Sequence, residues 1–126
     1  MGLVYADFTL TNLFTGKSVP IRALVDTGAT EAFVTPEIAK QLGFDAEEVR
    51  QKPVVLADGR RVYAPCLAPV EIRWAADRSY CMEVMVLGDE CLVGVVPLEV
   101  LDLVVDPKRL QVVPNPKHPD GPCARA

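Results

Sequence analysis

The 126-residue sequence has a single histidine, His118, and no closely spaced pair of cysteines. Zinc sites in proteins need cysteine or histidine ligands at short, regular spacing. We therefore predict no metal site, and nothing else in the sequence indicates a cofactor. Cys66, Cys81 and Cys91 fall inside or beside apolar stretches, so we expect them to be small core residues.

The sequence also lacks basic blocks and long apolar runs. Thirteen Lys and Arg residues against seventeen Asp and Glu residues give a net charge of -4, which argues against nucleic-acid binding. No apolar run approaches the length of a membrane-spanning helix, so no membrane association is expected. The first residues show neither a basic start nor a secretory apolar segment. We predict a cytoplasmic protein with reduced thiols.

What the sequence does contain predicts a mostly β domain. Half of the residues are hydrophobic, and valine and other branched residues that favour strands are frequent. Val4, Ala6, Phe8 and Leu10 alternate with polar neighbours, as on one buried face of a strand. One or two short helices interrupt the strands. The first is expected over residues 36–43 behind a Thr35 cap, and the second is a single turn over residues 97–101.

The two ends of the chain differ in composition. Residues 1–113 carry the strand and helix patterns and are predicted to form one domain. Residues 114–126 contain four prolines and almost no large apolar side chain. A segment of that composition buries too little surface to order itself, so we predict a Pro-rich flexible C-terminal tail with a solvated His118.

One short motif points to chemistry. The apolar residues 21–25, interrupted only by Arg22, lead directly into Asp26-Thr27-Gly28-Ala29-Thr30. Asp26 is thereby expected at the mouth of a core strand, and Gly28 permits a sharp turn. Asp-Thr-Gly is also an ordinary turn after a strand, so the three letters alone do not decide between a structural and a catalytic role.

The context of this motif resembles the retropepsin-like aspartic proteases, of the non-viral single-domain type. In that family an apolar strand ends in D-[ST]-G-[AS]-[ST], which residues 26–30 match. A hairpin with Asp58-Gly59 near its tip follows, and the apolar Leu92-Val93 pair ends at Gly94. The resemblance implies a closed acid-protease-like barrel with ψ-loops that works as a homodimer.

The resemblance also implies a role for each matching residue. Asp26 would be the catalytic carboxylate, and Thr27 would make hydrogen bonds between the two subunits. The remaining positions would complete the site: Gly28, Ala29 and Thr30 in the active-site loop, Ala57, Asp58 and Gly59 at a substrate-covering flap, and Gly94 packed beneath the loop.

The mechanism of this family needs two carboxyl groups that share one proton, and the sequence holds one Asp-Thr-Gly. We therefore predict a homodimeric aspartic endopeptidase acting on a peptide or protein substrate, with one Asp26 from each subunit. Val95 after Gly94, where retroviral members have arginine, and Thr30-Glu31 after Ala29 depart from the family pattern. These departures leave open a non-catalytic peptide-binding or dimerisation module. A third reading makes the motif a plain turn in a small β-barrel.

Overall fold

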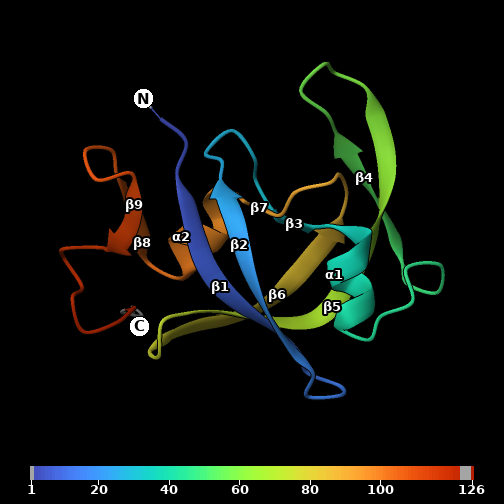
Figure 1. Cartoon of the computed structure of the whole chain (residues 1–126), viewed down its shortest axis with the longest axis horizontal. Helices are drawn as coiled ribbons and strands as arrows, with labels where there is room; N and C mark the ends of the chain where they lie inside the picture. The colour runs from blue at the N-terminus through green and yellow to red at the C-terminus, as the bar shows by residue number, and fades with distance from the viewer. Residues whose placement is uncertain (1, 123–125) are drawn as a thin grey trace.

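The computed structural model describes residues 2–122 and 126, and within them nine strands and two short helices form the fold (Figure 1). This confirms the prediction of a mostly β chain with one or two short helices. The strands are β1 Tyr5–Asn12, β2 Ser18–Val25, β3 Ala32–Val34, β4 Gln51–Val55, β5 Arg61–Trp74, β6 Arg78–Val86, β7 Leu92–Val93, β8 Leu103–Asp106 and β9 Gln111–Pro114; the helices are α1 Pro36–Gln41 and α2 Val95–Val100.

Seven strands form one sheet in the order β1-β2-β7-β3-β6-β5-β4, and β8 and β9 form a separate pair. Strand β1 pairs antiparallel with β2 and also with β5, so hydrogen bonding returns from β5 to β1. The short strand β7 lies parallel to β2 and antiparallel to β3. This insertion places the end of β2 next to the end of β7, which is where the candidate site forms.

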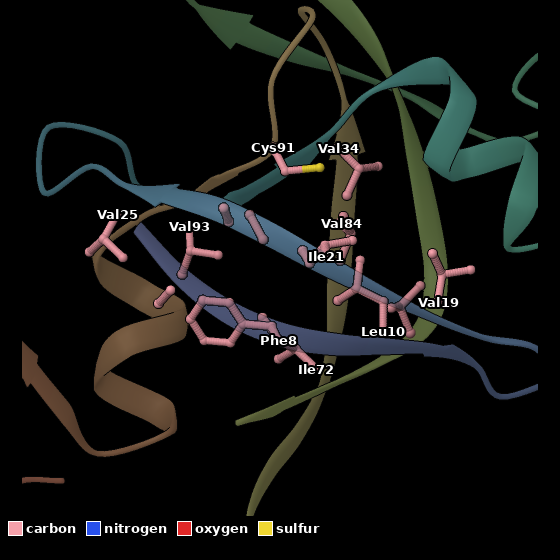
Figure 2. Packing of buried hydrophobic residues seen from close by; sticks show 14 of the residues in the cluster. Phe8, Leu10, Val19, Ile21, Val25, Val34, Ile72, Val84, Cys91 and Val93 are labelled. Atoms are coloured by element: carbon pink, nitrogen blue, oxygen red, sulfur yellow. The ribbon is translucent and has the colours of Figure 1, made fainter. Parts of the chain in front are cut away.

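The core lies between the facing sides of the long strands (Figure 2). Val4, Ala6, Phe8 and Leu10 are all buried, which confirms the alternation predicted for the first strand. Side chains from β2 and β7 complete this layer, and Figure 2 shows Val93 of β7 beside Phe8 of β1. Because every second residue points inward, the register of β1 against β2 is fixed by burial.

Helix α1 begins as the sequence predicts. Thr35 takes an extended conformation and its hydroxyl accepts a hydrogen bond from the Ile38 amide at 3.3 Å. Gly43 follows the helix with φ +84°, a left-handed conformation that glycine adopts without strain. Helix α2 starts at Val95, two residues before the predicted turn. No helix in the described part of the chain is long and apolar enough to cross a membrane.

Three details differ from the sequence predictions. The three-residue strand β3 was not predicted, because it is short and pairs only with strands far along the chain. Strand β5 is continuous, with an irregularity between Leu67 and Val70, whereas the sequence pattern predicts two separate strands over residues 61–64 and 67–74. Cys66 and Cys91 are buried as expected, but Cys81 is exposed.

The segment after β9 makes contacts that the sequence did not predict. The amide of Asn115 donates to the Asp102 carbonyl at 2.9 Å, and Nδ1 of His118 bonds to the Asp102 carboxylate. His118 is thus held against the body of the protein and is only partly exposed. Residues 115–118 therefore pack on the domain, whereas Cys123, Ala124 and Arg125 of the predicted tail lie outside the described residues.

Candidate active site

The Asp26 loop, residues 26–31, connects β2 to β3. Its first residue continues the pairing of β2 with β7, because the Asp26 amide donates to the Val93 carbonyl at 3.0 Å. The Asp26 carboxylate accepts a hydrogen bond from the Gly28 amide at 2.9 Å, and the Ala29 amide closes the turn onto the Asp26 carbonyl. The buried strand thus holds the backbone while the loop presents a half-buried carboxylate.

Helix α2 supports the loop from below through its first amides. Gly94 donates to the Glu31 carbonyl at 2.9 Å, Val95 to the Ala29 carbonyl at 2.9 Å, and Val96 to the Thr30 carbonyl at 3.0 Å. The first amides of a helix have no partner within the helix, so these three bonds satisfy both the helix and the loop. The loop backbone is consequently fixed at three consecutive carbonyls.

Gly94 lies where no side chain fits. A Cβ atom at this position would be 2.5 Å from the Ala29 carbonyl oxygen and 2.7 Å from the Glu31 carbonyl oxygen. Both are backbone atoms, which cannot move aside as a flexible side chain could. The close approach of β7 to the Asp26 loop therefore requires glycine, and the predicted position of Gly94 beneath the loop has this geometric basis.

The β4–β5 hairpin faces the loop. Its turn is closed by the Leu56 amide on the Arg60 carbonyl at 2.8 Å, and Gly59 takes φ +87°. Asp58 bonds to the Arg60 amide at 3.0 Å and to Arg60 Nε at 2.7 Å. These bonds to Arg60 hold the pKa of the exposed Asp58 carboxyl below its usual value of 3.8. The Asp58 side chain therefore hydrogen-bonds within its own turn and stabilises it.

A cleft of about 1030 Å³ separates the Asp26 loop from the β4–β5 hairpin. Of the residues predicted from the sequence, Asp26, Gly28, Ala29, Thr30 and Ala57 line it. Thr27, Asp58, Gly59 and Gly94 are not among its lining residues within the described chain. The structure thus brings the Asp26 motif and one residue of the predicted flap to the same cleft.

Other walls of the cleft were missed by the sequence reasoning. Apolar side chains of β4 and its turn, such as Val54 and Leu56, line it together with Phe33 of β3 and Met85 of β6. The segment 87–90 forms a further wall. The apolar stretch just before the Asp-Gly turn was a usable signal for β4. The role of β3 and of segment 87–90 depends on pairing between distant strands and leaves no local signal.

Charged groups at the base of the hairpin are paired with each other. Glu83 accepts from Lys52 and from Arg50, the latter at 2.9 Å. The Lys52 ammonium lowers the pKa of the Glu83 carboxyl, and Glu83 in turn raises the pKa of Lys52. Burial raises the pKa of the nearby Cys66 thiol, which favours the neutral form. Within the described residues no group of three or more His, Cys, Asp or Glu side chains is placed to hold a metal ion.

Comparison with protein families gives one match that covers most of the chain. Residues 13–102 match the family described as "Aspartyl protease". The matched region includes the Asp26 loop, the β4–β5 hairpin and Gly94. No curated protein sequence matches the chain.

Solved structures resemble the fold over most of its length. A retropepsin-like aspartic protease from Rickettsia conorii is 22% identical, with 84% of this chain and 90% of that chain covered and a TM-score of 0.57. The EIAV protease in complex with the inhibitor HBY-793 is 18% identical, with coverage of 79% and 88% and a TM-score of 0.60. The retroviral protease-like domain of Ddi1 from Leishmania major is 17% identical, with coverage of 92% and 90% and a TM-score of 0.61. At these identities the likeness concerns the fold, which is retropepsin-like.

Proposed function

The chain belongs to the aspartyl protease family, and from this premise we propose that it is a homodimeric aspartic endopeptidase with one catalytic Asp26 per subunit. The observation that carries the proposal is the position of Asp26 in the wall of the cleft, on a loop held by hydrogen bonds from β7 and α2. The fold of the chain is similar to those of the Rickettsia conorii and EIAV proteases. In this proposal β1–β5 pairing closes the large sheet into the barrel of the acid proteases.

The proposed reaction needs two carboxyl groups at hydrogen-bond distance that share one proton. The ionised carboxylate takes a proton from a bound water, and the protonated one hydrogen-bonds to the carbonyl of the scissile peptide bond. The water oxygen attacks the carbonyl carbon without a covalent enzyme intermediate. The carbon–nitrogen bond then breaks as the nitrogen receives a proton from the pair, which returns both carboxyl groups to their starting state.

A second copy of the chain is the simplest source of the second carboxylate, because Asp-Thr-Gly occurs once in the sequence. Thr27 is exposed beside Asp26 and is available for hydrogen bonds to the partner loop. Exposed apolar side chains on nearby segments, Leu3, Val96 and Leu110, would be covered in a dimer. Leu3 and Leu110 belong to adjoining segments, since a Cβ added at Gly2 would be 3.0 Å from the Leu110 side chain.

The β4–β5 hairpin is proposed to cover a peptide bound in the cleft. Its apolar side chains Val54 and Leu56 face the same space as Asp26, and Ala57 lies at the tip. An extended peptide between the hairpin and the loop would place its carbonyl groups near the carboxylates and its side chains against Phe33 and Met85. Asp58 and Gly59 would shape the turn of this flap.

The experiment measures cleavage of an unfolded protein substrate between about pH 4 and 7, where one shared proton is available. Asp26→Asn is expected to abolish cleavage, whereas Asp77→Asn, on the exposed β5–β6 turn, is expected to cleave normally. Cleavage by the Asp26→Asn protein would contradict the proposal. A dimer that binds the unfolded protein without cutting it would instead support a peptide-binding module.

A mixing experiment tests whether the site is shared between two chains. Wild-type protein is dissociated and reassembled with an excess of Asp26→Asn protein. If each site takes one carboxylate from each copy, activity per wild-type chain is expected to fall as mixed dimers form. Unchanged activity per wild-type chain would show that a single chain cleaves by itself and would contradict the shared site.

A further inference from the structure

Helix α2 lacks the side chains that usually stabilise the ends of a short helix. Its N-cap residue is Gly94, which offers no side-chain hydrogen bond, and its last turn contains no basic residue. Six residues are also too few for a helix to be stable on its own. The position of α2 must therefore be set by other segments of the chain.

At the N-terminal end those segments are in the Asp26 loop. The amides of Val95 and Val96 donate to the carbonyls of Ala29 and Thr30. Any displacement of α2 along its axis would lengthen these bonds, because both amides belong to the first turn of the helix. The conformation of the loop is thus coupled to the position of the helix.

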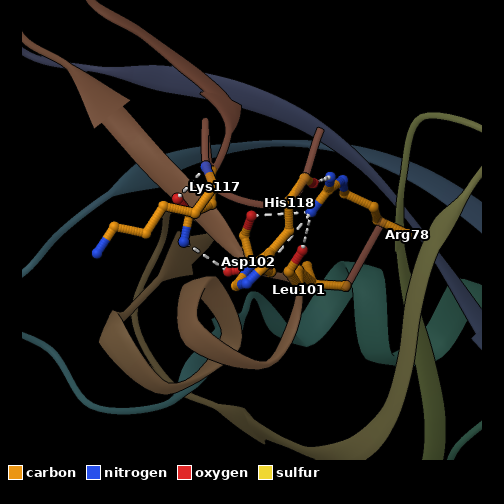
Figure 3. A network of polar contacts seen from close by, with 6 residues as sticks. Arg78, Leu101, Asp102, Lys117 and His118 are labelled. Carbon is orange, nitrogen blue, oxygen red and sulfur yellow. Dashed lines mark hydrogen bonds and ion pairs between the residues drawn. The ribbon is translucent and has the colours of Figure 1, made fainter. Parts of the chain in front are cut away.

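At the C-terminal end the position of α2 is set by Arg78, whose side chain is fully buried (Figure 3). Its Nη1 atom donates to the Leu101 carbonyl at 3.1 Å and to the Asp102 carbonyl at 2.9 Å. Its Nη2 atom donates to the His118 carbonyl at 2.7 Å. The guanidinium thereby supplies the positive charge that favours a helix C-terminus, from a strand far along the sequence.

Residues after β9 complete this arrangement. Asn115 Nδ2 donates to the Asp102 carboxylate at 2.9 Å, and His118 Nδ1 bonds to the other oxygen of the same carboxylate. Asp102 itself has φ +56°, which a residue other than glycine keeps only when its surroundings hold it. We call Arg78, Leu101, Asp102, Asn115 and His118 the Arg78 clamp.

The clamp fixes its end of the helix strongly. A buried guanidinium is costly unless its protons are bonded, so moving the helix end away from Arg78 would leave a desolvated cation and a Leu101 carbonyl without this donor. Arg78 Nε is already without a partner among the described atoms, so the three carbonyl bonds matter more. The helix that separates the clamp from the loop is only about 9 Å long and moves as one body.

We propose that Arg78 is a positioning residue for the Asp26 loop and acts through α2. We further propose that residues 115–118 help to hold α2 in this position. Arg78 does not touch the cleft. It holds the helix whose first amides hold the carbonyls of Ala29 and Thr30. The catalytic consequence rests on the proposed protease function, whereas the mechanical link between Arg78 and the loop does not.

The test uses two variants and a matched control in the full-length protein. Arg78→Lys keeps the charge but cannot reach three carbonyls in the same geometry. His118→Ala removes the imidazole from Asp102 and keeps the main-chain carbonyl. The control is Arg73→Lys, because Arg73 also donates to a backbone carbonyl, that of Ala76, but on an exposed hairpin end.

Two measurements separate positioning from a general loss of stability. Relative to the amides of the β1–β2 pair, hydrogen exchange at Val95 and Val96 is expected to quicken at least about 10-fold in Arg78→Lys, and less in His118→Ala, with no change in Arg73→Lys. With active sites titrated by a tight-binding peptide inhibitor, kcat per site is expected to fall about 10-fold with little change in KM, because the reacting groups are misplaced.

The outcomes decide the inference separately from the proposed function. Wild-type exchange at Val95 and Val96 in both variants would overturn it, as would unchanged kcat per titrated site. If Arg78→Lys does not fold, His118→Ala decides. If the wild-type protein cleaves nothing, the proposed function fails, and the exchange measurement still tests whether Arg78 holds the loop.

Discussion

The cleft and the Arg78 clamp use the same kinds of side chain in opposite ways. At the cleft, Asp58 and Arg60 pair with each other across a single exposed turn. At the clamp, Arg78 is buried and joins the end of α2 to His118, which lies 40 positions after Arg78 in the chain. The Asp58–Arg60 pair is local in sequence and exposed to solvent, whereas the Arg78 clamp is buried and joins residues that are far apart in sequence. Figure 1 shows the hairpin and the β8–β9 region at opposite ends of the molecule.

This difference in burial indicates which region is suited to reaction with a substrate and which region is suited to holding the fold in position. A carboxylate that must meet substrate has to stay accessible, and an accessible charge contributes little to stability. A buried charge with several bonds contributes specificity of position, at the risk of a large loss if one partner is removed. We therefore expect the reacting groups to lie in the cleft, and we expect the clamp to hold the Asp26 loop in the position that the reaction requires.

The largest effect is expected for Asp26→Asn, which should lower activity without lowering stability and so distinguishes the cleft most clearly from the clamp. Loss of one carboxylate from the pair is expected to lower kcat at least about 10³-fold, or about 4 kcal/mol of transition-state stabilisation. The free energy of unfolding of one chain is expected to change by less than about 0.5 kcal/mol, because within that chain the Asp26 side chain hydrogen-bonds only to its own loop. Kinetics and urea unfolding on one preparation check both. A large loss of stability would show that Asp26 also stabilises the fold, which would contradict the proposed difference between the cleft and the clamp.

The next largest effect is expected at the clamp. Arg78→Met would leave the buried Leu101 carbonyl without a donor and would remove one of two donors from each of the Asp102 and His118 carbonyls, so we expect a loss of about 3 kcal/mol in the free energy of unfolding. Arg60→Met, in the exposed hairpin turn, is the control and is expected to unfold like the wild type. Equal stability of the two variants in urea would show that the clamp is no stronger than the surface pair.

Gly94→Ala tests the contact between α2 and the loop directly. The added methyl group would overlap the backbone at Ala29 and Glu31, so we expect a loss of about 2 kcal/mol in stability. We also expect lower kcat, because the loop has to move away from β7. Gly16→Ala, in the β1–β2 turn and not among the cleft-lining residues, is a contrasting variant, since an added Cβ there meets nothing within 4 Å, although its φ of +78° adds some strain. Unfolding and kinetics that rank the two alike would contradict this account.

The smallest effects are expected from two carboxylates in acid. Asn115 and His118 hold the pKa of Asp102 below its usual 3.8, so the stability that Asp102 contributes is complete above that value and is lost as pH falls through the lowered folded-state pKa. Asp102→Asn is therefore expected to be less stable than wild type at pH 7, with the gap narrowing as the pH is lowered below 3.8.

Asp58 is the matched case at the cleft end. Its pKa is also lowered, but its partner Arg60 is two residues away, and such a contact survives partly in the unfolded chain. Asp58→Asn is expected to follow the wild-type stability at both pH values. Urea unfolding of wild type, Asp58→Asn and Asp102→Asn at the two pH values checks this expectation. A larger loss of stability in Asp58→Asn than in Asp102→Asn would contradict the proposed difference between the hairpin and the clamp.

The sequence predicted those parts of the fold that have local causes. Thr35 and Gly43 bound α1 through capping geometry that involves only neighbouring residues, and burial alternates along β1 as hydrophobicity does. The match of residues 26–30 to a family pattern pointed to the loop that lies in the wall of the cleft. These features could be read because each depends on a few consecutive residues.

The parts that could not be predicted depend on distant partners. No local sequence pattern around Arg78 predicts its burial, which is favoured by the distant carbonyls of Leu101, Asp102 and His118. In the same way, β3 is defined by its neighbours β6 and β7. His118 was expected to be solvated among prolines, and its partner Asp102 lies 16 residues earlier. Single-sequence reasoning has no access to such pairings.

The way α2 holds the Asp26 loop has a consequence for protein engineering. The three bonds run to main-chain carbonyls of residues 29–31, so the side chains of Thr30 and Glu31 take no part in fixing the loop. Both side chains are exposed and both residues line the cleft. In the proposed protease, positions 30 and 31 can therefore be randomised together to change the peptide specificity, while the scaffold that carries Asp26 is expected to keep its shape.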